Sequence, residues 1–109
     1  MALSALERKV VESIWIILGT AKGERVMRPD FGCDIHEFVF APLNETTVTL
    51  IRDAVEEALV LWEPRIEVLS VQARPEAREA VLAISVRYRI RTTNTEYNMV
   101  YPFYLRRGG

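Results

Sequence analysis

The chain has 109 residues, of which 50% are hydrophobic and 27% are charged, and its formal net charge at pH 7 is −1. This size and composition predict one globular domain, residues 1–109, and exclude a disordered chain or a domain stapled by disulfides. The lone Cys33 fits synthesis in a reducing cytoplasm, and the apolar stretch 14–18 is too short to cross a bilayer. We therefore expect a soluble protein without stable membrane insertion.

The charges are unevenly distributed along the chain. Residues 1–67 hold 12 acidic and 7 basic side chains, whereas residues 68–109 hold 3 acidic and 7 basic ones. Two such halves can attract each other within the domain, or they can meet complementary surfaces on neighbouring proteins in an assembly. The sequence leaves both possibilities open.

The first helix is predicted from about Ala5 to Leu18. Ser4 and Glu7 have the spacing of a capping box, in which each side chain accepts a hydrogen bond from the other residue's backbone N–H group. Apolar residues at helical spacing follow, and Gly19 is a candidate for a left-handed helix end. The apolar stripe is wider than one packing face requires, which suggests contacts on two sides.

Two more helices are expected before the middle of the chain gives way to strands. Asp34 can cap a short helix that runs through Phe40 before Pro42 stops it. Asn44 or Thr46 then caps a long helix in which apolar side chains recur with the spacing of one buried face. These apolar residues are Val48, Ile51, Val55, Ala58, Leu59 and Trp62.

The C-terminal half alternates apolar and polar residues with a period of two, which predicts a three-stranded antiparallel meander. The strands are expected at 66–74, 81–91 and 97–105, with turns at 75–79 and 93–95. Pro102 cannot donate a backbone hydrogen bond, so it argues that the last strand lies at an edge. The predicted fold class is α+β, with N-terminal helices packed on a three-stranded antiparallel sheet formed by the C-terminal half. One sheet face should be core and the other basic.

Two ordered segments stand out between these elements. The loop Gly23–Gly32 has turn formers at both ends and contains Pro29, which excludes a regular helix. The second segment is the break at Glu63, Pro64 and Arg65, where proline fixes its own φ and moves the preceding residue out of the helical region. A rigid corner that carries two opposite charges suits docking better than catalysis.

Metal and cofactor sites are not predicted. Cys33 and His36 have the spacing of half a zinc site, but the chain has no second cysteine or histidine to complete it. No glycine-rich phosphate loop is present. We therefore expect no metal, no cofactor and no cofactor-binding residue.

A small peptidoglycan hydrolase is one alternative function. Its chemistry needs one carboxylic acid in a desolvated pocket and a second carboxylate roughly 5 to 10 Å away beside a sugar cleft. Among 15 acidic residues such pairs arise by chance, so no catalytic residue is predicted. The candidates are Glu24, Asp30, Asp34, Glu37 and Glu63.

A module that binds single-stranded nucleic acid is the other alternative. Arginines on one strand can pair with phosphates while aromatic residues on the next strand stack on bases. The net charge of −1 argues against this function, and no nucleic acid is expected as a partner. The residues concerned are Arg87, Arg89 and Arg91, followed by Tyr97, Tyr101 and Phe103.

Two motifs at matching separation resemble the baseplate wedge family of contractile tails. The first is GERVMRPDFG at 23–32, which follows a helix ending in ILGT, and the second is WEPRI at 62–66, which follows a long helix. The family includes the small wedge protein of contractile phages, the corresponding component of type VI secretion systems and relatives in extracellular injection particles. The resemblance covers nearly the whole chain and leaves the type of particle open.

The resemblance implies a structural component of a baseplate, not an enzyme, that is assembled in the cytoplasm. It implies six copies per particle around the tail axis, in contact with larger wedge proteins, the sheath protein and hub or spike components. The implied role is to join the wedge to the sheath and to provide the platform for the first sheath ring.

The resemblance also assigns roles to residues. Glu63, Pro64 and Arg65 are implied to bind the sheath, with the alternative that the charged pair braces the fold. The loop motif is implied to serve a wedge contact or the fold through Gly23, Glu24, Arg25, Arg28, Pro29, Asp30, Phe31 and Gly32. Sheath strands would be added to an accessible sheet edge, for which the candidates are Tyr97, Met99, Tyr101 and Phe103.

Overall fold

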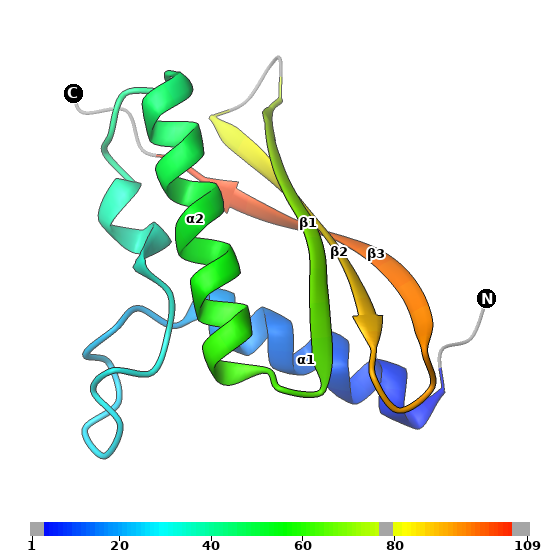
Figure 1. Cartoon of the computed structure of the whole chain (residues 1–109). Helices are drawn as coiled ribbons and strands as arrows, with labels where there is room; N and C mark the ends of the chain where they lie inside the picture. Colours follow the sequence, from blue (N-terminus) through cyan, green and yellow to red (C-terminus); the bar gives the residue numbers. More distant parts are fainter. Residues whose placement is uncertain (1–3, 77–79, 106–109) are drawn as a thin grey trace.

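The computed structural model describes residues 4–76 and 80–105, so the middle of the predicted turn at 75–79 lies outside the described residues. The three strands form one antiparallel sheet in the order β1, β2, β3, which leaves β1 and β3 at its edges (Figure 1). The predicted α+β class and C-terminal meander are confirmed. The elements are α1 (Ala5–Gly19), η1 (Asp34–Phe38), α2 (Glu45–Trp62), β1 (Ile66–Pro75), β2 (Val81–Ile90) and β3 (Thr95–Tyr104).

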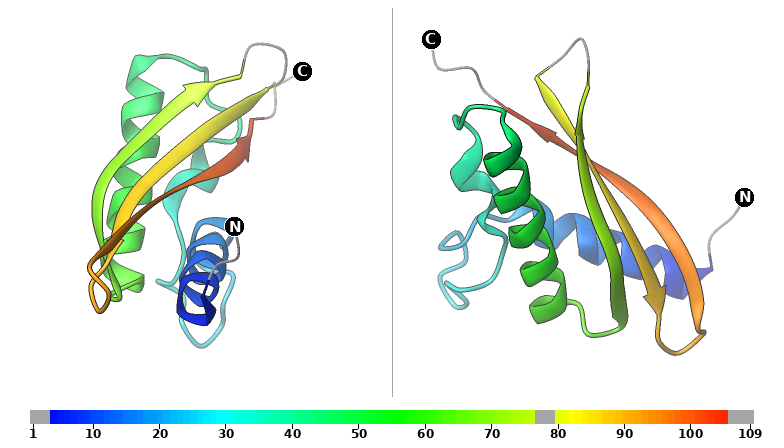
Figure 2. Two further views of the ribbon diagram at one scale, coloured as in Figure 1. Left: turned by 90° about the vertical axis from the view of Figure 1, so that its right-hand side faces the viewer. Right: turned by 45° about the horizontal axis from the view of Figure 1, so that its top comes forward.

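One face of the sheet packs against the helices. From Leu82 to Ile90 every second residue of β2 is buried, and the register places these residues opposite apolar or aromatic residues of both neighbouring strands, except that Ile90 faces Thr95 on β3. α2 lies beside β1 and α1 crosses towards β3 (Figure 2). Each buried aliphatic side chain stabilises the fold by about 1.5–3 kcal/mol. The helices contribute Val10, Ile14, Ile17, Leu18, Ile51, Val55, Ala58 and Leu59 to this core.

β1 contains a bulge. Its register with β2 shifts between Val68 and Ser70, which leaves Leu69 as an extra residue. As a result Val68 and Val71 both lie opposite core-facing residues of β2. The bulge therefore keeps the apolar side of β1 on the core while it bends an edge strand.

α1 ends differently from the prediction. Gly19 is its last residue but has no positive φ, and the C-cap is Thr20 with an extended φ of −101°. The Thr20 hydroxyl donates a hydrogen bond to the Ile16 carbonyl at 2.6 Å. The predicted left-handed stop at Gly19 is wrong, because the chain runs directly into a bridge between Ala21 and Cys33 and threonine satisfies the helix end.

The short second helix is a 3₁₀ helix that ends at Phe38, before the predicted Phe40. Asp34 does not cap it. The N-cap is Cys33, without a side-chain hydrogen bond, and the Asp34 carboxylate accepts from Lys22 Nζ at 3.0 Å instead. The prediction of an Asp34 cap is wrong because a lysine twelve positions earlier in the chain competes for that carboxylate.

The long helix α2 agrees with its prediction. Of the two candidate caps, Asn44 holds the position, because its side chain accepts a hydrogen bond from the Thr47 N–H group at 2.8 Å. The helix then continues to Trp62, the last residue before the corner. Within residues 4–76 and 80–105, no helix is both long enough and apolar enough to cross a membrane.

The open face of the sheet is not the basic surface that we expected. Arg87 donates to Glu96 at 2.8 Å, and Arg89 donates to Glu67 at 2.9 Å. The register explains these pairs, since Glu67 and Glu96 lie opposite Arg89 on the two neighbouring strands. The prediction rested on one strand alone, whereas the neighbouring strands supply carboxylates that neutralise Arg87 and Arg89. Arg91 bonds to the Pro64 carbonyl instead.

Candidate functional site

The corner between α2 and β1 begins at Glu63. This residue is the C-cap of α2, and its backbone N–H group donates to the Leu59 carbonyl at 2.9 Å. Pro64 cannot continue the helix, and β1 starts two residues later at Ile66. The Glu63 residue is only 1% exposed, although glutamate is seldom buried unless it is paired.

Arg65 is the partner of the buried carboxylate. Its Nε and Nη2 atoms each donate to a different oxygen of Glu63 at 2.8 Å, and its backbone N–H group adds a third bond at 3.2 Å. Two parallel bonds of this kind give the strongest arginine–carboxylate geometry. The Arg65 side chain is 41% exposed, so the anionic end of the pair is buried and the cationic end reaches the surface.

The surroundings of Glu63 keep its carboxylate ionised. Burial alone raises the pKa of Glu63, but hydrogen bonds from the Arg65 guanidinium and the Ser13 hydroxyl outweigh burial, so the pKa lies below its ordinary value. Hydrogen bonding to Glu63 in turn raises the pKa of Arg65. A carboxylate held in its charged form suits a structural contact, whereas a general acid needs a raised pKa.

Arg91, the residue after β2, bonds to this corner at the same end of the sheet. Its backbone N–H group donates to the Arg65 carbonyl at 2.9 Å, and its Nε donates to the Pro64 carbonyl at 3.2 Å. We had grouped Arg91 with a nucleic-acid face, so its role at the corner was missed. The available signal was its position just after β2, which an antiparallel hairpin places opposite the residue that precedes Ile66.

The loop after α1 is held in shape by its own backbone. The Gly23 N–H group donates to the Pro29 carbonyl at 2.8 Å, and the Cys33 N–H group donates to the Thr20 carbonyl at 2.9 Å. Gly32 has a φ of +127°, and a Cβ there would lie 2.5 Å from the Thr20 carbonyl oxygen. The ordered loop predicted from the sequence therefore depends on glycine at position 32.

The two sequence motifs meet at Trp62. The Phe31 and Trp62 rings pack edge to face with their centroids 5.1 Å apart. The Arg28 guanidinium lies 4.7 Å from the Trp62 ring centroid, and the Arg25 guanidinium lies 4.6 Å from that of Phe31. Such cation–π contacts contribute about 0.5–1 kcal/mol each at exposed sites. The loop motif therefore supports the last turn of α2, a role of Trp62 that the sequence reasoning missed.

The candidate carboxylates of a hydrolase do not share a desolvated pocket. Glu24, Asp30 and Glu37 are exposed, and Asp34 forms an ion pair with Lys22. Glu63 is buried, but it is charged and paired with an arginine. The described residues therefore bring no two of these five candidates into the acid and base arrangement that glycoside hydrolysis requires.

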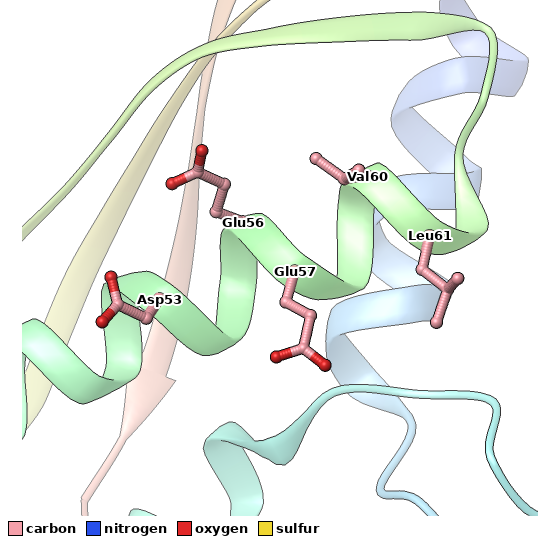
Figure 3. Close-up of a pocket in the computed structure, with 5 residues that line it drawn as sticks. All are labelled: Asp53, Glu56, Glu57, Val60 and Leu61. Atoms are coloured by element: carbon pink, nitrogen blue, oxygen red, sulfur yellow. The ribbon is translucent and has the colours of Figure 1, made fainter.

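A shallow hollow on the outer side of α2 also carries carboxylates. Its lining consists of Asp53, Glu56, Glu57, Val60 and Leu61 (Figure 3). Asp53 and Glu56 point to one side of the helix and Glu57 to the other, and all three residues are exposed. Water solvates each of these acids, so none matches the desolvated proton donor of a glycosidase.

Cys33 and His36 make separate contacts with the helices. The His36 Nε2 atom is hydrogen-bonded to the Leu18 carbonyl at 2.8 Å, and the Cys33 thiol donates to the Ala54 carbonyl at 3.5 Å. Burial raises the pKa of the Cys33 thiol to about 11, which disfavours the thiolate that binds metals. Across the part of the chain that the structure describes, no three His, Cys, Asp or Glu residues are grouped to hold a metal ion.

β3 is an edge strand, as Pro102 indicates. The Leu105 N–H group donates to the Ala80 carbonyl at 2.7 Å, and hydrogen-bonded pairs alternate along an antiparallel ladder. It follows that the residues predicted to form the strand-addition edge use their backbone groups to bond to β2, and that their side chains lie on the core face. These residues are Tyr97, Met99, Tyr101 and Phe103. The alternate residues of β3 direct their backbone groups away from β2. They are Glu96, Asn98, Val100, Pro102 and Tyr104.

These features define a small two-layer α+β domain with a braced corner and an open sheet edge. Residues 4–95 match the family of the baseplate wedge protein gp25, and the chain belongs to this family. Baseplate wedge protein gp25 of Enterobacteria phage T4 is 30% identical over 83 residues, which make up 76% of this chain. The chain spans 63% of the length of that T4 protein. The resemblance inferred from the two motifs is confirmed.

Two solved structures share the fold. A Geobacter sulfurreducens protein, named as a candidate tail lysozyme, is 61% identical, with a TM-score of 0.90 over 100% of this chain and 99% of that one. A chain in the baseplate complex of a type VI secretion system has a TM-score of 0.73 over 93% of this chain and 94% of its own. Its identity is 17%, so this second likeness concerns the fold alone.

Proposed function

We propose that this chain is a structural baseplate subunit that joins the wedge to the sheath and provides the platform for the first sheath ring. It stands in six copies around the tail axis, contacts larger wedge proteins and hub or spike components, and assembles in the cytoplasm. It catalyses no reaction. Family membership supports the baseplate role, and the observation that carries the sheath role is the open backbone edge of β3.

The β3 edge offers hydrogen bonds to an incoming strand. The N–H groups of Glu96, Asn98, Val100 and Tyr104 point away from β2, and no backbone partner within the described residues bonds to them. Val100 and Tyr104 are 50% and 65% exposed and would cover apolar side chains of an added strand. A sheath strand that pairs here would gain backbone bonds and also protect an edge that is otherwise prone to aggregation.

The β1 edge is less suited to strand addition. The Val71 carbonyl points outward at this edge, where it accepts a hydrogen bond from Arg52 Nε at 3.0 Å. The bulge at Leu69 bends the strand, and Pro75 lacks an N–H group at another outward position. Because the Arg52 bond, the bulge and Pro75 all hinder strand addition at β1, we assign the sheath contact to the β3 edge.

The corner has two roles in this proposal. Glu63 braces the turn from inside, while Pro64 and Arg65 are exposed and form the surface that meets the sheath. The guanidinium of Arg65 uses two donors on Glu63. Its remaining N–H groups have no partner in the described part of the chain and can meet an acidic group across the interface. The buried Glu63 carboxylate thus holds the exposed Arg65 guanidinium in a fixed position.

Under this proposal the chain is not a tail lysozyme, and the state of the buried Glu63 supports that view. The acid of a retaining or inverting glycosidase has a raised pKa, whereas the pKa of the buried Glu63 is lowered. Purified protein should therefore release no soluble fragments from peptidoglycan, and the variants Glu37→Gln and Asp30→Asn should not differ from it. Cleavage that either variant abolishes would assign an enzymatic function.

Reconstitution tests the structural role. The wedge proteins and sheath of the same particle are co-expressed with and without this chain, and the products are imaged by electron microscopy. The proposal expects complete baseplates with a first sheath ring only when the chain is present, in six copies. Sheath that polymerises on baseplates from which the chain has been removed would contradict it.

A further inference from the structure

Two apolar side chains at the tip of the loop after α1 are almost fully exposed. Val26 is 91% exposed and Met27 is 90% exposed, whereas no other large apolar side chain in the described residues exceeds the 69% of Phe40. The pair lies inside the loop motif, yet neither the fold nor the proposed sheath contact uses it. The fold gains little from either side chain, because both stay in water.

The exposure of this pair is built into an ordered loop. The Arg28 N–H group donates to the Arg25 carbonyl at 3.2 Å across the tip, and Gly23 and Pro29 close its base at 2.8 Å. These backbone bonds fix the loop while about nine-tenths of Val26 and of Met27 stays exposed. A preformed loop loses little conformational entropy when it binds, which favours its use as a docking element.

Two cations flank the apolar tip. Arg25 lies over Phe31 and Arg28 over Trp62, and neither has a carboxylate within ion-pair distance among the described residues. A guanidinium that stacks on a ring through its face keeps its N–H edge available for acceptors. The tip therefore presents an apolar pair between two cations whose side chains have no hydrogen-bond or ion-pair partner within residues 4–76 and 80–105.

We propose that Val26 and Met27 form a docking knob that inserts into an apolar cleft on a neighbouring larger wedge protein, with carboxylates at the cleft rim that meet Arg25 and Arg28. This inference rests on the proposed baseplate role. A protein cleft is a better partner for the tip than an anionic lipid surface. The exposed carboxylates of Glu24 and Asp30 balance the charges of Arg25 and Arg28, so the loop has no net positive charge to attract a membrane. A shaped cleft can match each charge separately.

The test compares two double variants of the full chain in binding to the affinity-tagged larger wedge protein of the same particle. V26S/M27S should weaken binding at least tenfold and leave the melting temperature within about 2 °C, because both side chains are already in water. The matched control is V60S/L61S, an adjacent apolar pair on α2 that is 65% and 57% exposed. This control should bind like the wild type.

Every other result contradicts the proposed baseplate role, the proposed knob or its protein partner. If the wild-type chain does not bind the wedge protein at all, the proposed baseplate role fails. If the wild type binds and V26S/M27S binds equally well, or if both double variants lose binding equally, the knob is wrong while the baseplate role stands. Co-sedimentation of the wild type with anionic phospholipid vesicles, lost in V26S/M27S, would assign the tip to a membrane instead.

Discussion

The Glu63 carboxylate and the Arg65 guanidinium form a two-point ion pair across Pro64, and the acid is buried while the base is 41% exposed. The pair joins the end of the longest helix to the start of the sheet. Loss of Glu63 and loss of Arg65 should affect stability to different degrees. Loss of Glu63 removes a buried charge, whereas loss of Arg65 leaves a buried charge without its partner.

Glu63→Gln should lower the free energy of unfolding by about 1–3 kcal/mol, because it replaces charge-assisted bonds in a buried site with weaker ones. Arg65→Ala should cost more, since the buried carboxylate then loses both guanidinium bonds and keeps the backbone N–H bond of residue 65. Urea denaturation measures both. The control Glu67→Gln breaks an exposed pair with Arg89 and should cost at most about 1 kcal/mol. Equal effects of Glu63→Gln and Glu67→Gln would contradict the bracing role.

The lowered pKa of Glu63 makes its contribution to stability depend on pH. A carboxylate whose pKa is lower in the fold than the ordinary 4.5 binds fewer protons in the native state, so its stabilisation is complete above that value. The stabilisation is lost as the pH falls through the folded pKa.

The difference in unfolding free energy between wild type and Glu63→Gln should therefore shrink below about pH 4.5. The comparison with the variant is needed because the pKa values of Glu7 and Glu96 are also lowered, by hydrogen bonds from Tyr97 and Arg87. Denaturation curves between about pH 3 and pH 7 provide the measurement. A difference that stays constant over this range would argue against an ionised Glu63 in the fold.

The two glycines of the loop should tolerate alanine to different degrees. Gly32→Ala places a Cβ 2.5 Å from the Thr20 carbonyl oxygen at a φ of +127°, so we expect a loss of about 2–4 kcal/mol from strain and steric overlap. Gly23→Ala has a φ of +93° with open space around it, and its cost should be nearer about 1 kcal/mol. Thermal unfolding of the two variants ranks them. The reverse order would mean that the loop is not held as described.

Single-stranded DNA should not be retained by this protein at low salt. Arg87 and Arg89 on the open face are paired with Glu67 and Glu96, so the charge of these two arginines is locally neutralised. The double variant E67Q/E96Q frees the arginines and should bind more strongly than the wild type in a filter assay at about 20 mM salt. Salt-dependent binding by the wild type that R87A/R89A abolishes would revive the nucleic-acid function.

Local signals in the sequence were sufficient for the elements but not for their ends and contacts. The capping box, the apolar stripe of α2 and the period of two identify α1, α2 and the strands, because each depends on neighbours within one helical turn or one strand. The end at Gly19 was mispredicted because Thr20 and the bridge at Ala21 decide it.

The site needed information from distant parts of the chain. The sequence marked Glu63 and Arg65 as a rigid pair, but only the fold shows which one is buried. The contacts of Trp62 with Arg28 and Phe31 and the hold of Arg91 on Pro64 join residues far apart in sequence. The charge of the open face likewise depends on strand register, which places glutamates opposite the arginines.

The most direct test of the sheath role is Val100→Pro. Val100 directs its N–H group away from β2, so proline there removes one donor from the open edge and no hydrogen bond from the sheet. The control Val100→Ala keeps that donor while it removes the same exposed side chain.

Both variants are reconstituted with the wedge and sheath proteins, and first-ring assembly is scored by electron microscopy after folding and baseplate incorporation have been verified. We predict that Val100→Pro folds and enters the baseplate but does not support the first sheath ring, whereas Val100→Ala does. Normal sheath assembly on Val100→Pro baseplates would contradict strand addition at the β3 edge.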